Sequence, residues 1–219
     1  YSSAAVYGAL IAAADLSKLL GKTENERRYR AGAEEIRGAI LKYLYDEKTG
    51  NFLKLIVCHD KERSLDSTID ISSAFGVFLF EVLPVNDSRL QKAMEQTKTA
   101  LTRSISGKGI ARYEGDGYYR ILGDTPGNPW FISTLWYAQY LIAKAQTEKD
   151  FDETREYLNW VVDRALPSGV LSEQIHPFTG EQVAASPLTW SHAEFVNTVL
   201  KYLDRAEEFG FCVACNPVP

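Results

Sequence analysis

Glu173 is a carboxylate at a position where side-chain packing alone does not require one. It lies in the stretch 168–190, directly after the apolar pair Val170-Leu171 and before a turn marked by His176-Pro177. The apolar pair should leave water and anchor the loop, so that the carboxylate is held in one place. Glu173 is therefore a candidate for chemistry, and the alternative interpretation is a solvated loop glutamate.

A second group of candidates lies between residues 112 and 130. Segment 112–116 reads Arg-Tyr-Glu-Gly-Asp, segment 118–120 reads Tyr-Tyr-Arg, and segment 127–130 reads Gly-Asn-Pro-Trp. Aromatic rings stack on the C–H faces of sugars, and charged groups bond their hydroxyls, so this mixture favours a carbohydrate site. The alternative is a polar loop with aromatic side chains packed beneath it. We expect Trp136 in the core and Trp130 at the rim of the site.

The other groups that could do chemistry lack partners at a useful spacing. His176 and His192 are isolated from Cys and from carboxylate pairs, so we interpret them as structural polar residues rather than metal ligands. Cys212 and Cys215 have the spacing of half a zinc site or of a redox pair, but no second pair exists and Cys58 is distant. The pair is interpreted as a feature of the tail, and the sequence predicts no metal and no cofactor.

The elements that must position these residues are helices of two alternating kinds. Segments that are apolar on most faces predict inner helices, and each is followed by a segment with one apolar stripe, which predicts an outer helix. We expect Thr23 to begin a capping box and Asp66 to cap the second inner helix. The expected helices cover, approximately, residues 2–20, 23–44, 67–83, 87–104, 130–142, 151–162 and 188–208. The pattern predicts an all-α fold made of helical hairpins.

The connections between helices differ in length in a regular way. Turns from an inner to an outer helix span a few residues, whereas the connections from an outer helix to the next inner helix are each about twenty. Gly50, Gly109 and Gly169 recur in the long connections at a spacing of about sixty, each followed by two largely apolar residues and then by polar ones. All long connections should therefore lie at one end of the helices, whether these form an open solenoid or a closed ring. Binding and catalytic residues usually lie at such an end.

Composition limits the class of protein. The chain has 219 residues, of which 45% are hydrophobic and 24% charged, enough to bury a core. A net charge of -5 without clusters of Lys and Arg argues against nucleic acid and against a membrane surface as partners. No apolar run is long enough to span a bilayer. Three cysteines are too few for a disulfide framework, so we expect a cytoplasmic rather than a secreted protein.

Four motifs carry a resemblance to a known family. They are Arg112-Tyr113, Gly127-Asn128-Pro129-Trp130-Phe131, Leu171-Ser172-Glu173-Gln174 and Pro187-Leu188-Thr189-Trp190-Ser191-His192-Ala193-Glu194-Phe195. In their order and spacing they resemble the catalytic domain of glycoside hydrolase family 15, which contains glucoamylases, glucodextranases and some microbial trehalases. The helix pattern extends this resemblance to the whole chain up to its tail, and the chain is similar to the C-terminal half of such a domain.

The resemblance implies a fold and a site. The fold would be part of an (α/α)6 toroid of the six-hairpin glycosidase type, with residues 1–208 as the C-terminal portion of the catalytic domain and 209–219 as a tail. Glu173 would be the catalytic general base. The substrate-binding residues that the resemblance implies are Arg112, Tyr113, Trp130, Gln174 and Trp190.

The resemblance also implies a reaction, the exo-acting and inverting hydrolysis of α-glucosidic bonds in a glucan or maltooligosaccharide. In the family, the general acid lies in a Trp-Glu-Glu stretch just before the helix that residues 3–20 resemble, so we expect the chain alone to be inactive. The missing N-terminal half, or a partner chain, should cover the open toroid. Three alternatives stay open: a trehalase or glucodextranase of the same family, a non-catalytic glucan-binding or regulatory toroid, and an unrelated helical repeat.

Overall fold

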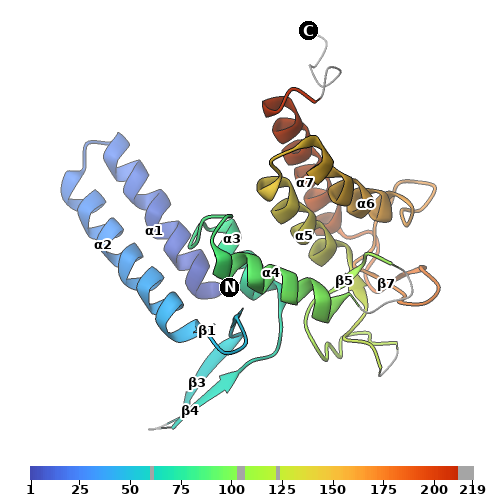
Figure 1. Ribbon diagram of the computed structural model, residues 1–219, viewed down its shortest axis with the longest axis horizontal. Helices are drawn as coiled ribbons and strands as arrows, with labels where there is room; N and C mark the ends of the chain where they lie inside the picture. The colour runs from blue at the N-terminus through green and yellow to red at the C-terminus, as the bar shows by residue number, and fades with distance from the viewer. Residues whose placement is uncertain (60–61, 103–106, 122–123, 212–219) are drawn as a thin grey trace. The chain divides into compact units, whose positions relative to one another are not determined.

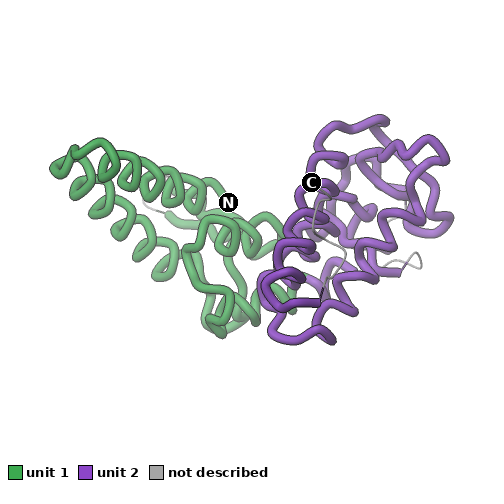
Figure 2. Tube along the Cα trace, turned by 90° about the horizontal axis from the view of Figure 1, so that it is seen from above, with its two compact units in different colours: residues 1–97 green, residues 98–219 purple. Residues whose placement is uncertain are grey.

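The computed structural model describes residues 1–59, 62–102, 107–121 and 124–211 of the chain (Figure 1). Its contacts divide the chain into two compact units, residues 1–97 and residues 98–219, coloured separately in Figure 2. The sequence predicts that residues 1–208 form one portion of a domain, and the division into two units is visible only in the structure.

Unit 1 is built on an antiparallel helical hairpin of α1 and α2, which lie side by side in Figure 1. A single π-helical turn, η1, continues α2, and two further helices follow after a long connection. The helices are α1 (Ser2–Leu19), α2 (Thr23–Ala39), η1 (Ile40–Leu44), α3 (Ile71–Leu79) and α4 (Ser88–Leu101), the last of which continues across the boundary into unit 2. Helices are therefore present over each of the first four predicted segments.

Helix α1 is less buried than its apolar sequence predicts. Its buried residues are small or lie on one side, as Ala4, Tyr7, Ala14 and Ser17 do, whereas Leu19 is 83% exposed. Within unit 1, α1 lies against α2 and, over a shorter stretch, against α3. Two neighbouring helices cover one side of a helix only, so the prediction that α1 is buried on most faces is wrong within unit 1, whereas α3 is buried over most of its residues.

The predicted starts of two helices are also wrong. The N-cap of α3 is Asp70, whose carboxylate accepts the backbone N–H of Ser72 at 2.9 Å. Asp66 instead accepts the backbone N–H of Thr68 in a turn before the helix. Helix α2 includes Thr23, and its N-cap is Lys22, which makes no side-chain cap. Asp is favourable both in turns and at N-caps, so its presence alone does not decide between the two positions.

The long connection of unit 1 forms two β-hairpins. Strands β1 (Tyr45–Asp46) and β2 (Asn51–Phe52) pair antiparallel, and β3 (Leu55–His59) pairs with β4 (Glu62–Asp66) in the register Leu55 opposite Asp66. Gly50 precedes β2 at a φ of 76°, in the left-handed region that a glycine enters most easily. Each of these strands pairs only within its own hairpin in the part of the chain that the structure describes.

Unit 2 packs its helices around α5, which is the inner helix that the sequence predicts. Eleven residues of α5 are buried, whereas α6 buries one side through residues such as Phe151, Tyr157 and Trp160. The helices are α5 (Phe131–Lys144), the short 3-10 helix η2 (Glu148–Asp150), α6 (Phe151–Val162) and α7 (Thr189–Glu208). The alternation of an inner and an outer helix is confirmed for α5 and α6.

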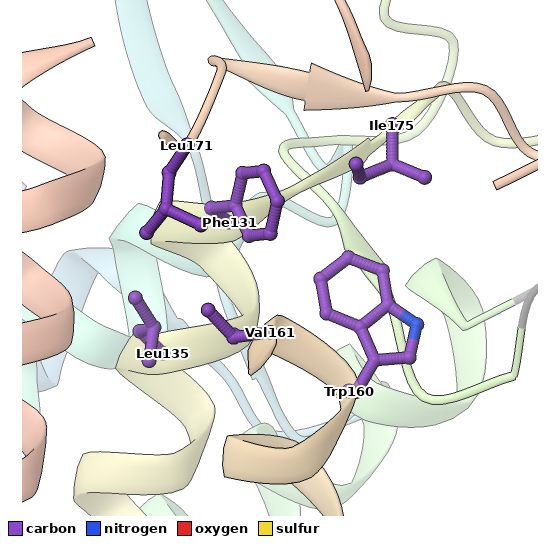
Figure 3. Packing of buried hydrophobic residues seen from close by; sticks show 6 residues of the cluster. All are labelled: Phe131, Leu135, Trp160, Val161, Leu171 and Ile175. Carbon is purple, nitrogen blue, oxygen red and sulfur yellow. The ribbon is translucent and has the colours of Figure 1, made fainter. Parts of the chain in front are cut away.

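The two long connections of unit 2 join in one small antiparallel sheet. Its strands, in spatial order, are β5 (Ile110–Ala111), β6 (Pro129–Trp130), β7 (Gln174–Ile175) and β8 (Gln182–Val183). Leu171 and Ile175, from the second connection, pack on Phe131 and Leu135 of α5 and on Trp160 and Val161 of α6 (Figure 3). The fold is mainly helical, and the strands lie in the connections between helices.

The end of the described chain contacts the helices. Phe209, the first residue of the predicted tail, has its ring centroid 6.4 Å from that of Phe151, and Phe211 stacks on Phe209 at 5.4 Å. Cys212 and Cys215 lie outside the described residues. Cys58 is exposed and has a free thiol. Among the described helices, none combines the length and the hydropathy that crossing a membrane requires.

Candidate active site

The sheet of unit 2 brings three candidate residues together. Arg112 directly follows β5, Trp130 is the last residue of β6, and Glu173 directly precedes β7. Ile110 pairs with Trp130, and Trp130 pairs with Gln174, so the backbone fixes all three positions. The loops that contain Gly109 and Gly169 thus meet at one place, as the sequence predicts for them.

Gly109 allows β5 to approach the helices closely. A Cβ atom at this position would lie 2.4 Å from Cζ2 of Trp160 and 2.6 Å from Cβ of Pro129, which real side chains do not tolerate. Only a glycine lets the strand pass between α6 and β6 at this distance. The recurring glycine of the sequence is therefore required here by packing.

Arg112 is held by Asp116, which is 1% exposed. Nε of Arg112 donates to Oδ2 of Asp116, and a terminal nitrogen donates to Oδ1, both at 2.9 Å. Such a two-point pair fixes the guanidinium plane. Oδ1 of Asp116 also accepts the backbone N–H of Tyr118 at 3.1 Å, which ties the following loop to the same carboxylate. The hydrogen bonds and charge of Asp116 raise the pKa of Arg112, although its partial burial opposes them most strongly, and Arg112 stays a fixed cation.

Aromatic rings surround the guanidinium of Arg112. Its central carbon lies 4.5 Å from the ring centroid of Trp130, 4.9 Å from that of Tyr113 and 5.6 Å from that of Tyr118. Trp130 is only 4% exposed, so the prediction that it lies at the rim is wrong, whereas Trp136, at 8%, is in the core as predicted. The pairing of β6 on both sides buries Trp130, and the periodicity of its helix does not reveal that pairing.

The buried side chain of Asn128 joins the two connections. Its Nδ2 donates to Oε1 of Gln174 at 2.7 Å and to the carbonyl of Tyr119 at 2.8 Å, and its Oδ1 accepts the backbone N–H of Ile121. Nε2 of Gln174 donates to the carbonyl of Tyr118 at 3.4 Å, and Gln174 is completely buried. Gln174, implied by the resemblance as a substrate-binding residue, thus supports the loop 118–121 in this structure.

The backbone around Glu173 is fixed on both sides. The N–H of Glu173 donates to the carbonyl of Ala185 at 2.8 Å. The hydroxyl of Ser191, in the first turn of α7, donates to the carbonyl of Ser172 at 2.7 Å, and Nε2 of His192 accepts the N–H of Leu171 at 3.1 Å. Leu171 itself is 3% exposed, so the predicted anchoring of this loop is confirmed. His192 has the structural role that the sequence predicts.

The carboxyl group of Glu173 has a raised pKa. Burial is the largest cause, and Asp116 adds to it, whereas the charge of Arg112 and hydrogen bonds from Gln174 and Tyr118 lower the pKa by less. The oxygen Oε2 is buried and accepts no hydrogen bond from the side chains and backbone that the structure describes. A carboxylate that water solvates poorly binds a proton more tightly, which suits a base that must take a proton from water.

Trp190 lies on α7, directly before Ser191, and is half exposed. Its ring centroid is 5.8 Å from that of Trp136 with the planes at 64°, and Nε1 donates to Oε1 of Glu194 at 3.2 Å. The bond from Ser191 to Ser172 places this turn of α7 beside the backbone that precedes Glu173. Trp190 is therefore linked to the Glu173 loop through its neighbour Ser191, which bonds the carbonyl of Ser172. Arg112 and Trp130, in contrast, contact each other directly.

Three residues contribute to the site that the sequence did not single out. Asp116 orients Arg112, Asn128 joins the two connections, and Tyr118 lies close enough to Glu173 that the carboxylate raises the pKa of its phenol. All three lie inside motifs that were noted for their neighbours. The only signal in the sequence is the spacing of four between Arg112 and Asp116, which is too common in proteins to identify a pair.

No group of three His, Cys, Asp or Glu side chains that could hold a metal ion is present among the described residues. The polar groups near Glu173 are instead a guanidinium, amides, a phenol and carboxylates. Groups of these kinds can form hydrogen bonds with sugar hydroxyls.

Sequence comparisons match this chain to sugar-cleaving enzymes. The family model described as "Glycosyl hydrolases family 15" matches residues 1–200. An uncharacterised glycosyl hydrolase of Methanocaldococcus jannaschii is 31% identical over 205 residues, which are 90% of this chain and 31% of the relative. A trehalase of Thermoplasma volcanium is 23% identical over 202 residues, 92% of this chain and 29% of that enzyme. The chain thus spans about a third of the length of the curated relatives that it matches.

Comparisons with solved structures find a similar fold in glucoamylases. A crystal structure of a bacterial glucoamylase complexed with acarbose matches 93% of this chain and 33% of its own, with a TM-score of 0.76 and 20% identity. The glucoamylase of Saccharomycopsis fibuligera matches 96% of this chain and 56% of its own, with a TM-score of 0.69 and 16% identity. The predicted fold class, part of an (α/α)6 toroid, is confirmed.

Proposed function

Because the chain belongs to glycosyl hydrolase family 15, we propose that the complete gene product hydrolyses α-glucosidic bonds with inversion, removing glucose from the end of a glucan or maltooligosaccharide. Membership in the family makes this chain a portion of a glycosidase. The observation that carries the finer proposal is the partly buried carboxyl group of Glu173, held next to the fixed cation Arg112.

Glu173 is the general base in this proposal. An inverting glycosidase uses one carboxylate to activate water on one face of the sugar and one carboxylic acid to protonate the leaving oxygen on the other face. The raised pKa and the partial exposure of its side chain support the role of base for Glu173. The water proton passes to Glu173 as the water oxygen bonds the anomeric carbon, and the acid gives its proton to the departing sugar.

The groups around Glu173 bind the substrate. Arg112 has a side chain that is 36% exposed, and its guanidinium can donate to sugar hydroxyls while Asp116 holds its plane. Tyr118, at 45% exposure, and Trp190, at 50%, offer ring faces for the C–H surface of a pyranose. Trp130 helps to hold Arg112, because its ring centroid lies 4.5 Å from the central carbon of the guanidinium. Tyr113 helps to position Arg112, because its ring centroid lies 4.9 Å from the central carbon of the guanidinium.

Trehalose is the second candidate substrate. Two curated relatives, from Thermoplasma volcanium and Thermoplasma acidophilum, are trehalases that cover 92% of this chain. The glucoamylases match in fold and the trehalases in sequence, so neither comparison selects the bond that is cleaved. A glucodextranase activity of the same family and a non-catalytic glucan-binding role are the remaining alternatives.

We further propose that residues 1–219 alone are inactive. An inverting reaction needs a second carboxyl group about 6.5 to 9.5 Å from the base, and the Trp-Glu-Glu stretch that holds the acid in the family does not occur in this sequence. Without an acid the leaving group departs as an alkoxide. Exposed apolar side chains, such as Leu16 and Leu19 on α1 and Leu20 directly after it, support a partner for unit 1, either the preceding part of the same protein or another chain.

The test compares three proteins on maltose, trehalose and dextran. The complete gene product should hydrolyse at least one of them, and NMR of the fresh product should show β-glucose from an α-linked substrate. Glu173→Gln should lower kcat by roughly 100- to 10,000-fold, and residues 1–219 alone should show no turnover. Glu181→Gln, an exposed glutamate of the same connection, is the matched control and should retain full activity. Full activity of Glu173→Gln would show that another residue is the base.

A further inference from the structure

The indole of Trp190 is fixed although the side chain is half exposed. Its N–H, the only polar group of the ring, donates to Oε1 of Glu194, one helical turn further along α7. The ring also meets that of Trp136 of α5 in a T-shaped contact, with the ring centroids 5.8 Å apart. An exposed tryptophan can rotate and bond water, whereas these two contacts hold one ring orientation and leave an apolar surface open.

Glu194 is fixed in turn by a buried amide. Its Oε2 accepts Nε2 of Gln139 at 2.8 Å, and Gln139 is 1% exposed on the inner helix α5. The same Nε2 donates to Oγ1 of Thr198 at 3.0 Å, and Oε1 of Gln139 accepts Nζ of Lys201 at 3.1 Å. Because Lys201 can only donate, the amide of Gln139 has one defined orientation, with its NH2 group towards Glu194. Both oxygens of Glu194 thus have fixed donors.

We propose that Glu194, oriented by Gln139, is a positioning residue that sets the plane of the Trp190 ring, and that the exposed ring surface stacks on a glucosyl unit of the substrate. The inference rests on the proposed function. The first turn of α7 is bonded to the backbone just before Glu173, so a ring fixed on this turn keeps its place relative to the base. Glu194 acts through Trp190 and does not contact the sugar.

The geometry distinguishes this role from simple stabilisation of α7. In Glu194→Gln the side chain has one acceptor and one NH2 group, so either Trp190 or Gln139 faces a donor instead of an acceptor. Trp190→Phe keeps a ring but removes the N–H, which makes the identity of residue 194 irrelevant to its orientation. The two changes should therefore not add. A role of Glu194 in helix stability alone predicts additive losses.

The experiment measures maltose binding by calorimetry in the Glu173→Gln background, and steady-state kinetics on maltose and trehalose in the active complete gene product. Glu194→Gln and Trp190→Phe should each raise the dissociation constant and KM by about three- to tenfold, with kcat and its pH profile unchanged. The double variant should be no weaker than Trp190→Phe. Asn197→Ala, an exposed position on α7, should change neither quantity.

Each other outcome has a defined meaning. The positioning role is overturned by additive losses in the double variant, by a fall in kcat without a change in KM, or by unchanged binding in Glu194→Gln. In each of these cases, hydrolysis by the parent protein still supports the proposed function. Absence of both binding and hydrolysis in the parent overturns the proposed function and, with it, this inference.

Discussion

The long connections of the two units begin alike and pair differently. In both, a glycine directly precedes a two-residue strand: Gly50 precedes β2 and Gly109 precedes β5. In unit 1 the strands β3 and β4 pair with each other, and Leu65 of that hairpin is 61% exposed. In unit 2 the strand β6 of one connection pairs with β7 of the next, and Trp130 between them is 4% exposed. Pairing across connections is what buries and fixes the groups of the candidate site.

Strand pairing between connections explains why the residues of the candidate site have fixed positions. A two-stranded hairpin fixes residues relative to their sequence neighbours, and alone it is marginally stable. A sheet assembled from two connections fixes residues about sixty positions apart, and its own buried bonds, such as Asn128 to Gln174, make it rigid. The predictions below test this contrast, beginning with the largest effect.

Removing the central ring of the cross-connection sheet should have the largest effect. Trp130→Ala should lower the free energy of unfolding by about 3 to 5 kcal/mol, because the ring is buried between Arg112 and the core. Leu65→Ala, in the self-paired hairpin, should lower it by less than about 1 kcal/mol, since the side chain is mostly exposed. Urea unfolding of the complete gene product measures both. Equal losses at the two positions would contradict the contrast between the units.

Asn128→Ala should have the next largest effect. It leaves the buried Oε1 of Gln174 without its donor from Asn128 and removes the bond to the carbonyl of Tyr119, so we expect a loss of about 2 kcal/mol and faster amide hydrogen exchange in residues 118–121. The matched change in unit 1 is Asp66→Ala, which removes a local turn bond to Thr68. That variant should lose less than about 1 kcal/mol. Unchanged exchange in the 118–121 loop would show that Asn128 does not hold it.

A smaller, pH-dependent effect is expected for Glu173→Gln. The pKa of Glu173 is raised above the ordinary value of 4.5, so the folded protein holds this proton more tightly than the unfolded chain. Stability then falls as pH rises through the raised pKa, and glutamine escapes this loss. The variant should be more stable than the parent at neutral pH, and the difference should shrink as pH falls through the raised pKa towards 4.5, below which both states of the parent are protonated. Thermal unfolding at several pH values measures it, and a less stable variant at neutral pH would disprove the raised pKa.

The smallest effect is expected on the hairpin of unit 1. Leu65→Thr introduces a residue that favours strands and removes exposed apolar surface. The free energy of unfolding should therefore change by less than about 0.5 kcal/mol. Light scattering should show less self-association if Leu65 is open to water in the complete gene product. An unchanged scattering signal together with a clear loss of stability would show that another part of the protein covers Leu65.

The sequence by itself determined the helices, the order of the motifs and the anchoring of Glu173. Helix periodicity is local, so α5 is correctly predicted as an inner helix, and the apolar Leu171 next to Glu173 already indicates a held loop. The mixture of aromatic and charged residues in two connections was also enough to select a sugar site for testing.

Only the tertiary structure determined which of the candidate site residues contact one another. The burial of Trp130, the pair of Arg112 with Asp116 and the engagement of Gln174 by Asn128 all depend on strands pairing between connections. The register of two-residue strands leaves almost no signal in a sequence, because the pairing energy comes from residues distant along the chain. The exposure of α1 has the same origin, since burial depends on which helices lie beside it rather than on its own apolar residues.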